Sequence, residues 1–171
     1  SKRWKEVASH AWKSRRFLSL TENTEENWGW SLETLHARLT IPVIRSMLRK
    51  CGAGLRGIEA THSCVFSRVV MENIGEFCPN LDSLSIRTCT HVNVDHPFSI
   101  SMCRKIKKFS IVHLVDEKFL TKILSKLRIL KSLTIQGDEE CYLENVLFKL
   151  PSTLEELHLC DVDICEQAFR Q

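Results

Sequence analysis

Five short segments with the same apolar pattern recur along the chain at nearly constant spacing, and this repeat limits the possible folds more than any other feature. Each segment runs apolar-x-x-apolar-x-apolar, and the clearest copy is Leu81, Leu84 and Ile86. The segments start at residues 55, 81, 106, 130 and 154, so the steps are 26, 25, 24 and 24 residues. Such regularity predicts one structural unit repeated along the chain, with neighbouring copies stacked side by side.

The end of each segment alternates apolar and polar residues, which predicts a short strand with one buried face. Between the strands, apolar residues recur at helical spacing over 66–77, 119–130 and 142–150, and a last helix is predicted over 165–170. A strand and a helix of this size cannot bury their apolar faces alone, whereas stacked copies can. The predicted fold class is therefore α/β: a curved solenoid with a parallel sheet inside and helices outside. The apolar face of each predicted helix consists of Val69, Val70, Ile74 and Phe77; Leu120, Ile123, Leu124 and Leu127; and Val146, Leu147 and Leu150.

Composition divides the chain into two differently built regions. With 43% hydrophobic and 26% charged residues in 171, the chain is predicted to fold. All four Trp lie within the first 30 residues, and all eight Cys lie after residue 50. No stretch approaches the roughly 18 uncharged apolar residues of a membrane span, and the first residues lack a signal-peptide core, so no membrane contact is predicted.

The cysteines are predicted to be small buried residues of a reducing compartment, which places the protein in the cytoplasm, the nucleus or both. No Cys-x-x-Cys pair exists. The nearest approach to a metal cluster lacks a second compact ligand pair, so no metal and no other cofactor is predicted. That cluster consists of Cys89, His91, His96 and Cys103.

Sequence motifs of catalysis are missing from the chain, which predicts that it is not an enzyme. It has no nucleophile elbow, phosphate loop, zinc-protease helix or dinucleotide fingerprint. One dense basic cluster occurs in the repeat region, and it has no interleaved aromatic residues, so nucleic acid is not predicted as a partner. This cluster is predicted to be solvated, with a phosphate or acidic-partner contact as the alternative. Its members are Arg104, Lys105, Lys107 and Lys108.

The strand residues that lie between the buried ones are predicted to share the concave face, because side chains alternate across a strand. Reading the copies in register gives three columns. The columns are Gly57, Ser83, Lys108, Ser132 and Glu156; Glu59, Ser85, Ser110, Thr134 and His158; and Thr61, Arg87, Val112, Gln136 and Cys160. They change from basic at Arg87 and Lys108 to acidic at Glu156, which would orient a partner. The candidate partner-binding residues are Ser83, Ser85, Arg87, Lys108, Ser110, Thr134, Gln136, Glu156 and His158.

Upstream of the repeats, the first residues can form an amphipathic helix that covers the first copy. Trp4, Val7 and Ala8 share one helical face with Trp12 further on, while basic residues lie outside it.

Leu81-x-x-Leu84-x-Ile86-x-x-Cys89 resembles the consensus of leucine-rich repeats, of the type with Cys in the last position. The copies at 130 and 154 depart from that pattern, with Asp138 and Val162 at this position. The segment SKRWKEVA, residues 1–8, resembles the last helix of an F-box, and the following W…FLSLT resembles the link to the repeats. Together they resemble the F-box/leucine-rich-repeat family.

The resemblance implies a substrate-recognition subunit of an SCF-type (Skp1–cullin–F-box) E3 ubiquitin ligase, a non-catalytic receptor acting in protein degradation. A Skp1-like adaptor would bind the F-box, of which Trp4, Val7 and Ala8 would be a remnant, and the repeats would bind the protein substrate. The expected organisation is F-box remnant and link over 1–20, linker and first helix over 21–54, and repeats over 55–171, in a fragment of a longer chain. The alternative is a non-catalytic leucine-rich-repeat interaction scaffold unrelated to ubiquitin.

Overall fold

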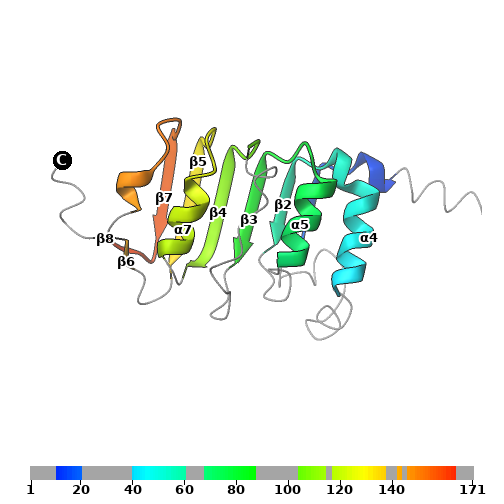
Figure 1. The fold of residues 1–171 in the computed structure, drawn as a ribbon, viewed down its shortest axis with the longest axis horizontal. Coiled ribbons are helices and arrows are strands. Elements are labelled where there is room, and N and C mark those ends of the chain that lie inside the picture. Colours follow the sequence, from blue (N-terminus) through cyan, green and yellow to red (C-terminus); the bar gives the residue numbers. More distant parts are fainter. Residues whose placement is uncertain are drawn as a thin grey trace, which may run out of the picture.

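A six-stranded parallel sheet forms the centre of the computed structural model, which describes residues 11–20, 40–60, 68–87, 104–114, 117–137, 142–143 and 146–164. The strand order is β1-β2-β3-β4-β5-β7, so strands adjacent in the sheet follow one another along the chain (Figure 1). A separate short parallel pair joins β6 to β8. The six strands are β1 (Phe17–Ser19), β2 (Gly57–Ala60), β3 (Ser83–Arg87), β4 (Lys108–Leu114), β5 (Ser132–Gly137) and β7 (Glu156–Cys160), and the short pair is β6 (Tyr142–Leu143) and β8 (Asp163–Ile164).

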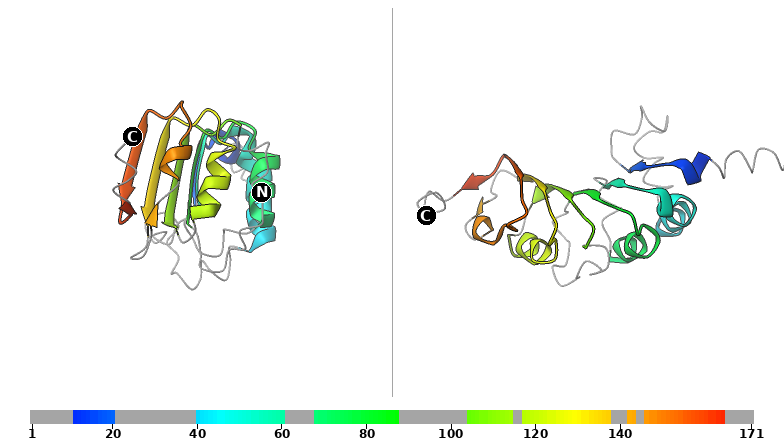
Figure 2. Two further views of the ribbon diagram at one scale, coloured as in Figure 1. Left: turned by 60° about the vertical axis from the view of Figure 1, so that its left-hand side comes forward. Right: turned by 90° about the horizontal axis from the view of Figure 1, so that it is seen from above.

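Three α-helices cover one face of this sheet: α4 (Ile41–Cys51), α5 (Arg68–Phe77) and α7 (Glu117–Leu124). Seen from above, the helices form one layer and the strands the other, and none of the described helices lies on the opposite face (Figure 2). Two short 3-10 turns, η1 (Gly52–Gly54) and η2 (Leu147–Lys149), and a helical stretch at residues 11–14 complete the described elements. The protein is therefore α/β, as predicted.

Helix α4 shows why these segments become helices. A proline in its first turn, Pro42, fits a position where a backbone N–H is not needed. Ile44, Leu48 and Cys51 recur at steps of four and three residues and are buried, which gives the helix one apolar face against the sheet. Arg49 and Lys50 lie in the last turn, where positive charge favours the helix dipole.

The core lies between the sheet and the helices, and it consists of the apolar positions of the sequence repeat. In β3 and β5, buried and partly exposed residues alternate along the strand, as the predicted period of two requires. The buried repeat positions are Leu55, Ile58, Ala60, Leu81, Leu84, Ile86, Ile106, Phe109, Ile111, Leu130, Leu133 and Ile135. Five strands thus occupy the segments from which they were predicted, each starting two residues after the first apolar position.

The strand register confirms the three predicted columns over the described residues. Gly57 pairs with Ser83, Ser83 with Lys108, Lys108 with Ser132, and Ser132 with Glu156. The second column follows from Glu59 to His158, and the third from Arg87 to Cys160, in the same register. Thr61, the predicted start of the third column, lies outside the described residues.

Each strand begins with the same backbone arrangement, which aligns it on its predecessor. The N–H groups of Lys107 and Lys108 both donate to the carbonyl oxygen of Asp82, at 2.7 and 3.0 Å. Paired donation of this kind occurs at all five junctions of the sheet; the shared acceptors are Arg16, Arg56, Asp82, Lys107 and Lys131. The backbone therefore holds six residues in one row along the edge where the strands start: Arg16, Arg56, Asp82, Lys107, Lys131 and Glu155.

Strand β1 was not predicted from the sequence. It pairs in parallel with β2 through Phe17, Leu18 and Ser19, in the segment expected to link an F-box to the repeats. Leu18 and Leu20 are buried in the same core as the later strands. The reason for the omission is visible in the sequence, because Arg15 stands where the other copies have their first apolar residue.

Three helix predictions need correction. The described residues within 142–150 do not form an α-helix: Tyr142–Leu143 form β6, and a 3-10 turn spans Leu147–Lys149. Leu150 has an extended backbone because Pro151 follows it and disfavours helical geometry at the preceding residue. Helix α7 ends at Leu124, short of the predicted residue 130, and turns carry the chain to β5. Val69 is 45% exposed, so it lies off the buried face of α5. The predicted helix over 165–170 lies outside the described residues.

Candidate functional site

The sheet face opposite the helices carries the candidate partner-binding residues. In β3, Ser83, Ser85 and Arg87 are half-buried and alternate with the buried Leu84 and Ile86. The same alternation places the remaining candidates of β4, β5 and β7 beside them, and all nine lie on one face of one sheet. The structure thus brings together residues that are separated by up to 75 positions in the sequence, from Ser83 to His158.

The middle column is made of short polar side chains over most of its length. Ser85, Ser110 and Thr134 are half-buried neighbours in register, and His158 at the edge strand is exposed. Strand β1 extends this column with Ser19, whose hydroxyl donates to Glu59 Oε2 at 3.1 Å. Neighbouring strands lie about 4.8 Å apart, so these hydroxyl groups form a closely spaced polar line across the sheet that a partner backbone can approach.

A side-chain pair at the far end of β3 and β4 was missed by sequence reasoning. Arg87 Nη2 lies 2.6 Å from His113 Nε2. Arginine can only donate, so in this contact His113 Nε2 is the acceptor. His113 has a positive φ of 53°, next to a register shift between Val112 and Leu114. Because this irregularity turns the histidine toward Arg87, the strict alternation of the sequence pattern did not reveal the contact.

The predicted change of charge across the face is present in the strand positions. Lys108 lies on β4 and Glu156 on β7, one strand beyond Ser132, and both are exposed. Two strand spacings, about 10 Å, therefore separate a cation from an anion along the first column. A partner with unlike charges at that separation would be held in one orientation.

Two of the three described cysteines are buried, as predicted. Burial raises the pKa of the Cys51 thiol, and burial together with the neighbouring Cys51 raises the pKa of Cys78 to about 12. Both thiols therefore remain protonated and unreactive near neutral pH. Cys160 is the exception to the predicted burial: it is exposed on β7, because it occupies the outward-facing third column at the edge strand.

Within the described parts of the chain, no group of three or more His, Cys, Asp or Glu side chains is placed to hold a metal ion. The Cys89, His91, His96 and Cys103 cluster lies outside those parts. None of the described helices is long and apolar enough to cross a membrane.

The predicted adaptor-binding residues Trp4, Val7 and Ala8 also lie outside the described residues. The adjoining residues 11–14 are helical, and Trp12 packs partly buried against the core. The Arg15 guanidinium lies over the Trp12 ring, 5.1 Å from its centroid, which is a cation–π contact. This stretch is thus attached to the sheet through both Trp12 and β1.

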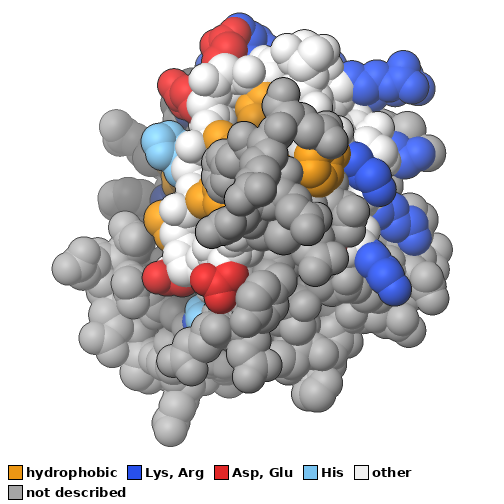
Figure 3. All heavy atoms as spheres, turned by 90° about the vertical axis from the view of Figure 1, so that its left-hand side faces the viewer, with side chains coloured by type: hydrophobic (Ala, Val, Ile, Leu, Met, Phe, Trp, Pro, Cys, Tyr) orange, Lys and Arg blue, Asp and Glu red, His pale blue; other side chains and the backbone are white. Residues whose placement is uncertain are grey.

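The β7 end of the sheet leaves apolar side chains at the surface. Phe148 is 54% and Leu157 is 37% exposed, and hydrophobic side chains show through between charged ones on this side of the molecule (Figure 3). Glu155, Glu156 and His158 are exposed beside them. Apolar side chains are therefore exposed at this end of the sheet, as Phe17 on β1 is at the other end.

Comparisons of this chain with protein-family models, with curated proteins and with solved structures found no match.

Proposed function

We propose that the strand–helix units form a leucine-rich-repeat solenoid and that its open sheet face binds a protein partner. The observation that carries this proposal is the register: nine exposed or half-buried residues from four strands share one face that the described helices leave uncovered. A line of hydroxyl groups, flanked by Arg87 and Lys108 on β3 and β4 and by Glu156 on β7, supplies hydrogen bonds and orientation to an extended protein surface.

The proposed biological role is that of a substrate-recognition subunit in an SCF-type ubiquitin ligase. The F-box-like residues 1–8 before the repeats support this role, since an adaptor-binding helix directly before a repeat array joins two binding functions in one chain. The protein would hold a substrate near the ubiquitin-conjugating enzyme and raise its local concentration, without catalysing the transfer itself.

The adaptor part of the proposal is tested with the full-length parent protein. Affinity-tagged parent is recovered from cells under reducing conditions, and Skp1 is measured in the recovered material. Trp4→Ala with Val7→Ala should reduce the recovered Skp1, whereas Lys122→Ala on the exposed side of α7 is the matched control. Recovery of no Skp1 with the unmodified parent would overturn the ubiquitin-ligase role.

The binding-face part of the proposal is tested separately. Proteins that co-purify with the parent while the proteasome is inhibited are compared for Arg87→Glu and the control Lys122→Glu. The expected result is that the Arg87 variant alone loses co-purifying proteins while thermal unfolding shows that it is still folded. The same comparison is made for one substitution in each of the other two columns. If every column variant recovers the same proteins as the Lys122 control, binding at this face is refuted.

The second candidate is an interaction scaffold unrelated to ubiquitin, and strand β1 favours it. Residues 11–20 contribute to the core beneath the sheet, because Leu18 and Leu20 are buried in it and Trp12 packs against it. An N-terminal cap of a repeat protein performs this task without any adaptor. Under this candidate, Skp1 is not recovered, and the binding-face experiment still gives its positive result.

A further inference from the structure

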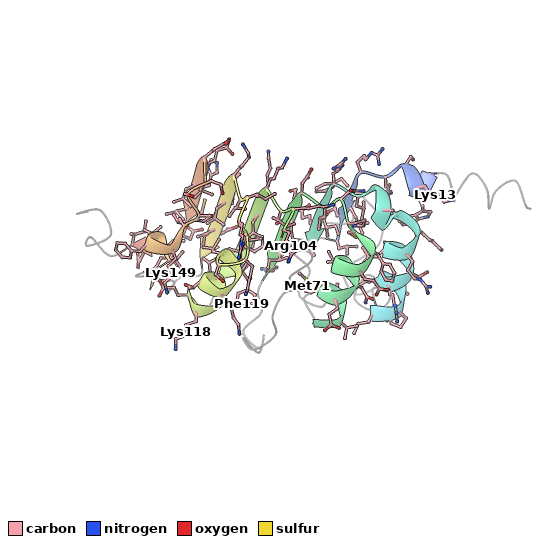
Figure 4. All side chains as sticks on the ribbon, turned by 45° about the horizontal axis from the view of Figure 1, so that its top comes forward. Lys13, Met71, Arg104, Lys118, Phe119 and Lys149 are labelled. Atoms are coloured by element: carbon pink, nitrogen blue, oxygen red, sulfur yellow. The ribbon has the colours of Figure 1, made fainter. Side chains whose placement is uncertain are left out.

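The edge of the sheet where the strands begin carries a row of alternating blocks of charge. The six residues aligned there by the backbone are, in sheet order, Arg16, Arg56, Asp82, Lys107, Lys131 and Glu155. Their charges read plus, plus, minus, plus, plus, minus. Lys108 follows Lys107 and belongs to the first column, so two exposed lysines lie at the start of β4 at this edge. Nitrogen-tipped side chains project along this edge (Figure 4).

Only part of this row is available to a partner. Arg16 Nη1 donates to the Gly54 carbonyl at 3.0 Å, which ties β1 to the turn before β2. Arg56 Nη1 donates to the Asn80 carbonyl at 3.5 Å in the next turn. These two arginine side chains therefore hold neighbouring turns of the protein together.

The side chains of Lys107 and Lys108, at the start of β4, make no such contact with a described neighbouring turn. Within the described residues, neither Lys107 nor Lys108 has a side-chain partner, and both are exposed. Lys131 lies beside Lys107 in the row and pairs with Glu155 on the other side, at 2.5 Å. The edge thus presents two unpaired ammonium groups and a third that is paired only at the surface, between Asp82 and Glu155.

We propose that this edge, defined by Lys107, Lys108 and Lys131, binds a short acidic segment of a partner protein. The row from Asp82 to Glu155 covers three strand spacings, about 14 Å, which is the length of about four residues of extended peptide. The ligand therefore carries acidic side chains opposite the lysines and neutral or basic residues opposite Asp82 and Glu155. The inference rests on the proposed function only in taking the partner to be a protein.

The charge pattern distinguishes this ligand from a nucleic acid. A phosphate backbone has a negative charge at every nucleotide, so a strand that continues past the lysines meets Asp82 on one side and Glu155 on the other. Single-stranded nucleic acids also bind through stacked aromatic side chains, and the described residues 104–107 and 125–131 include none.

The test measures direct binding of labelled probes to the 171-residue chain by fluorescence anisotropy. The first probe is a peptide with a short run of Glu flanked by Lys, the second has Gln in place of Glu, and the third is single-stranded RNA of similar length. We expect the Glu peptide to bind and the Gln peptide not to bind. We also expect the affinity for the Glu peptide to fall with added salt.

Charge reversal locates the site. Lys107→Glu with Lys108→Glu should weaken binding of the Glu peptide at least about tenfold, since two attractive charges become repulsive. The matched control, Lys50→Glu with Lys122→Glu on α4 and α7, changes the net charge equally and should leave the affinity within about twofold. Thermal unfolding of each variant excludes loss of the fold, and Lys107→Gln with Lys108→Gln replaces the first variant if it unfolds.

Three outcomes would overturn the inference: equal binding of the Glu and Gln peptides, equal weakening by the control variant, or tighter binding of RNA than of the Glu peptide. None of these depends on Skp1. Failure of the adaptor experiment therefore leaves this result standing, and the reverse also holds.

Discussion

Strands β5 and β7 follow the same sequence pattern and pair with each other in register, but they are buried to very different degrees. Leu133 in β5 is 0% exposed, whereas the equivalent Leu157 in β7 is 37% exposed. The same difference separates Leu130 from Leu154 and Ile135 from Leu159. Strand β5 has a strand on each side and the α7 helix near it, while β7 is paired on one side only within the sheet. A repeat position thus obtains its burial from its neighbours, so one motif stabilises the fold unequally along the chain.

The largest predicted effect comes from placing a charge at equivalent positions of the two strands. Leu133→Asp introduces a carboxylate into a fully buried site and should cost at least about 3 kcal/mol of unfolding free energy. Leu157→Asp should cost about 1 kcal/mol, because the charge can reach water. Denaturant unfolding of both variants measures the difference. Equal destabilisation would mean that β7 is as well buried as β5 and that the comparison is wrong.

Two cysteines allow a second test of the difference between the interior and the β7 end. Cys160 on β7 is exposed, whereas the pKa of the buried Cys78 is raised to about 12. At pH 8, iodoacetamide should modify Cys160 well before Cys78 in the folded protein, as measured by peptide mass spectrometry. Cys160→Ser should remove the fast modification. Equal modification rates for the two thiols in the absence of denaturant would contradict the burial of Cys78.

The raised pKa of Cys78 also makes the free energy of unfolding depend on pH. The folded pKa of Cys78 lies above its ordinary value of 9.0, so the thiol favours the folded state at and below pH 9. This contribution is lost as the pH rises from 9 toward 12, because the unfolded chain loses the proton first. The unfolding free energy should therefore fall by up to about 1.4 kcal/mol per pH unit in that range.

The smallest predicted effect concerns the ion pair that joins the two strands. Lys131 and Glu155 have side chains that are 52% and 62% exposed, so water screens their attraction. A double-mutant cycle with Lys131→Met and Glu155→Gln should give a coupling energy of about 0.5 kcal/mol or less. A coupling above about 1 kcal/mol, insensitive to salt, would show that this pair holds β7 in place.

Sequence reasoning succeeded where the periodic pattern was long and failed where it was short. Five strands and the register of their outward columns follow from apolar residues that repeat at steps of 24 to 26. Strand β1 has only three residues and lacks the first apolar position, so no period could reveal it. Residues 142–150 have helical spacing, but Tyr142 and Leu143 pair with β8 instead, and Pro151 disfavours helical geometry at Leu150.

The candidate site was likewise predicted only in part. Alternation along the strands sufficed to assign the nine residues of the open face. The contact of Arg87 with His113 depends on a backbone irregularity. The row of charged residues at the strand starts depends on the backbone hydrogen bonds that align neighbouring strands. The basic residues 104–108 stand out in the sequence, but their bracketing by Asp82 and Glu155 is a property of the sheet, because those acidic residues lie far from them along the chain.

The repeated backbone arrangement at the start of each strand separates register from connection length. Each strand after β1 is aligned by the carbonyl oxygen of the residue just before the preceding strand, so the segment between two strands can change in length without displacing either one. The steps of 26, 25, 24 and 24 residues already vary in this way. An insertion in a connection should therefore be tolerated. A single residue inserted between Lys107 and Phe109, by contrast, would move the buried side chains of β4 to the open face and the outward-facing ones into the core. A chain built this way can widen its open sheet face by duplication of whole units, with no change to the existing ones.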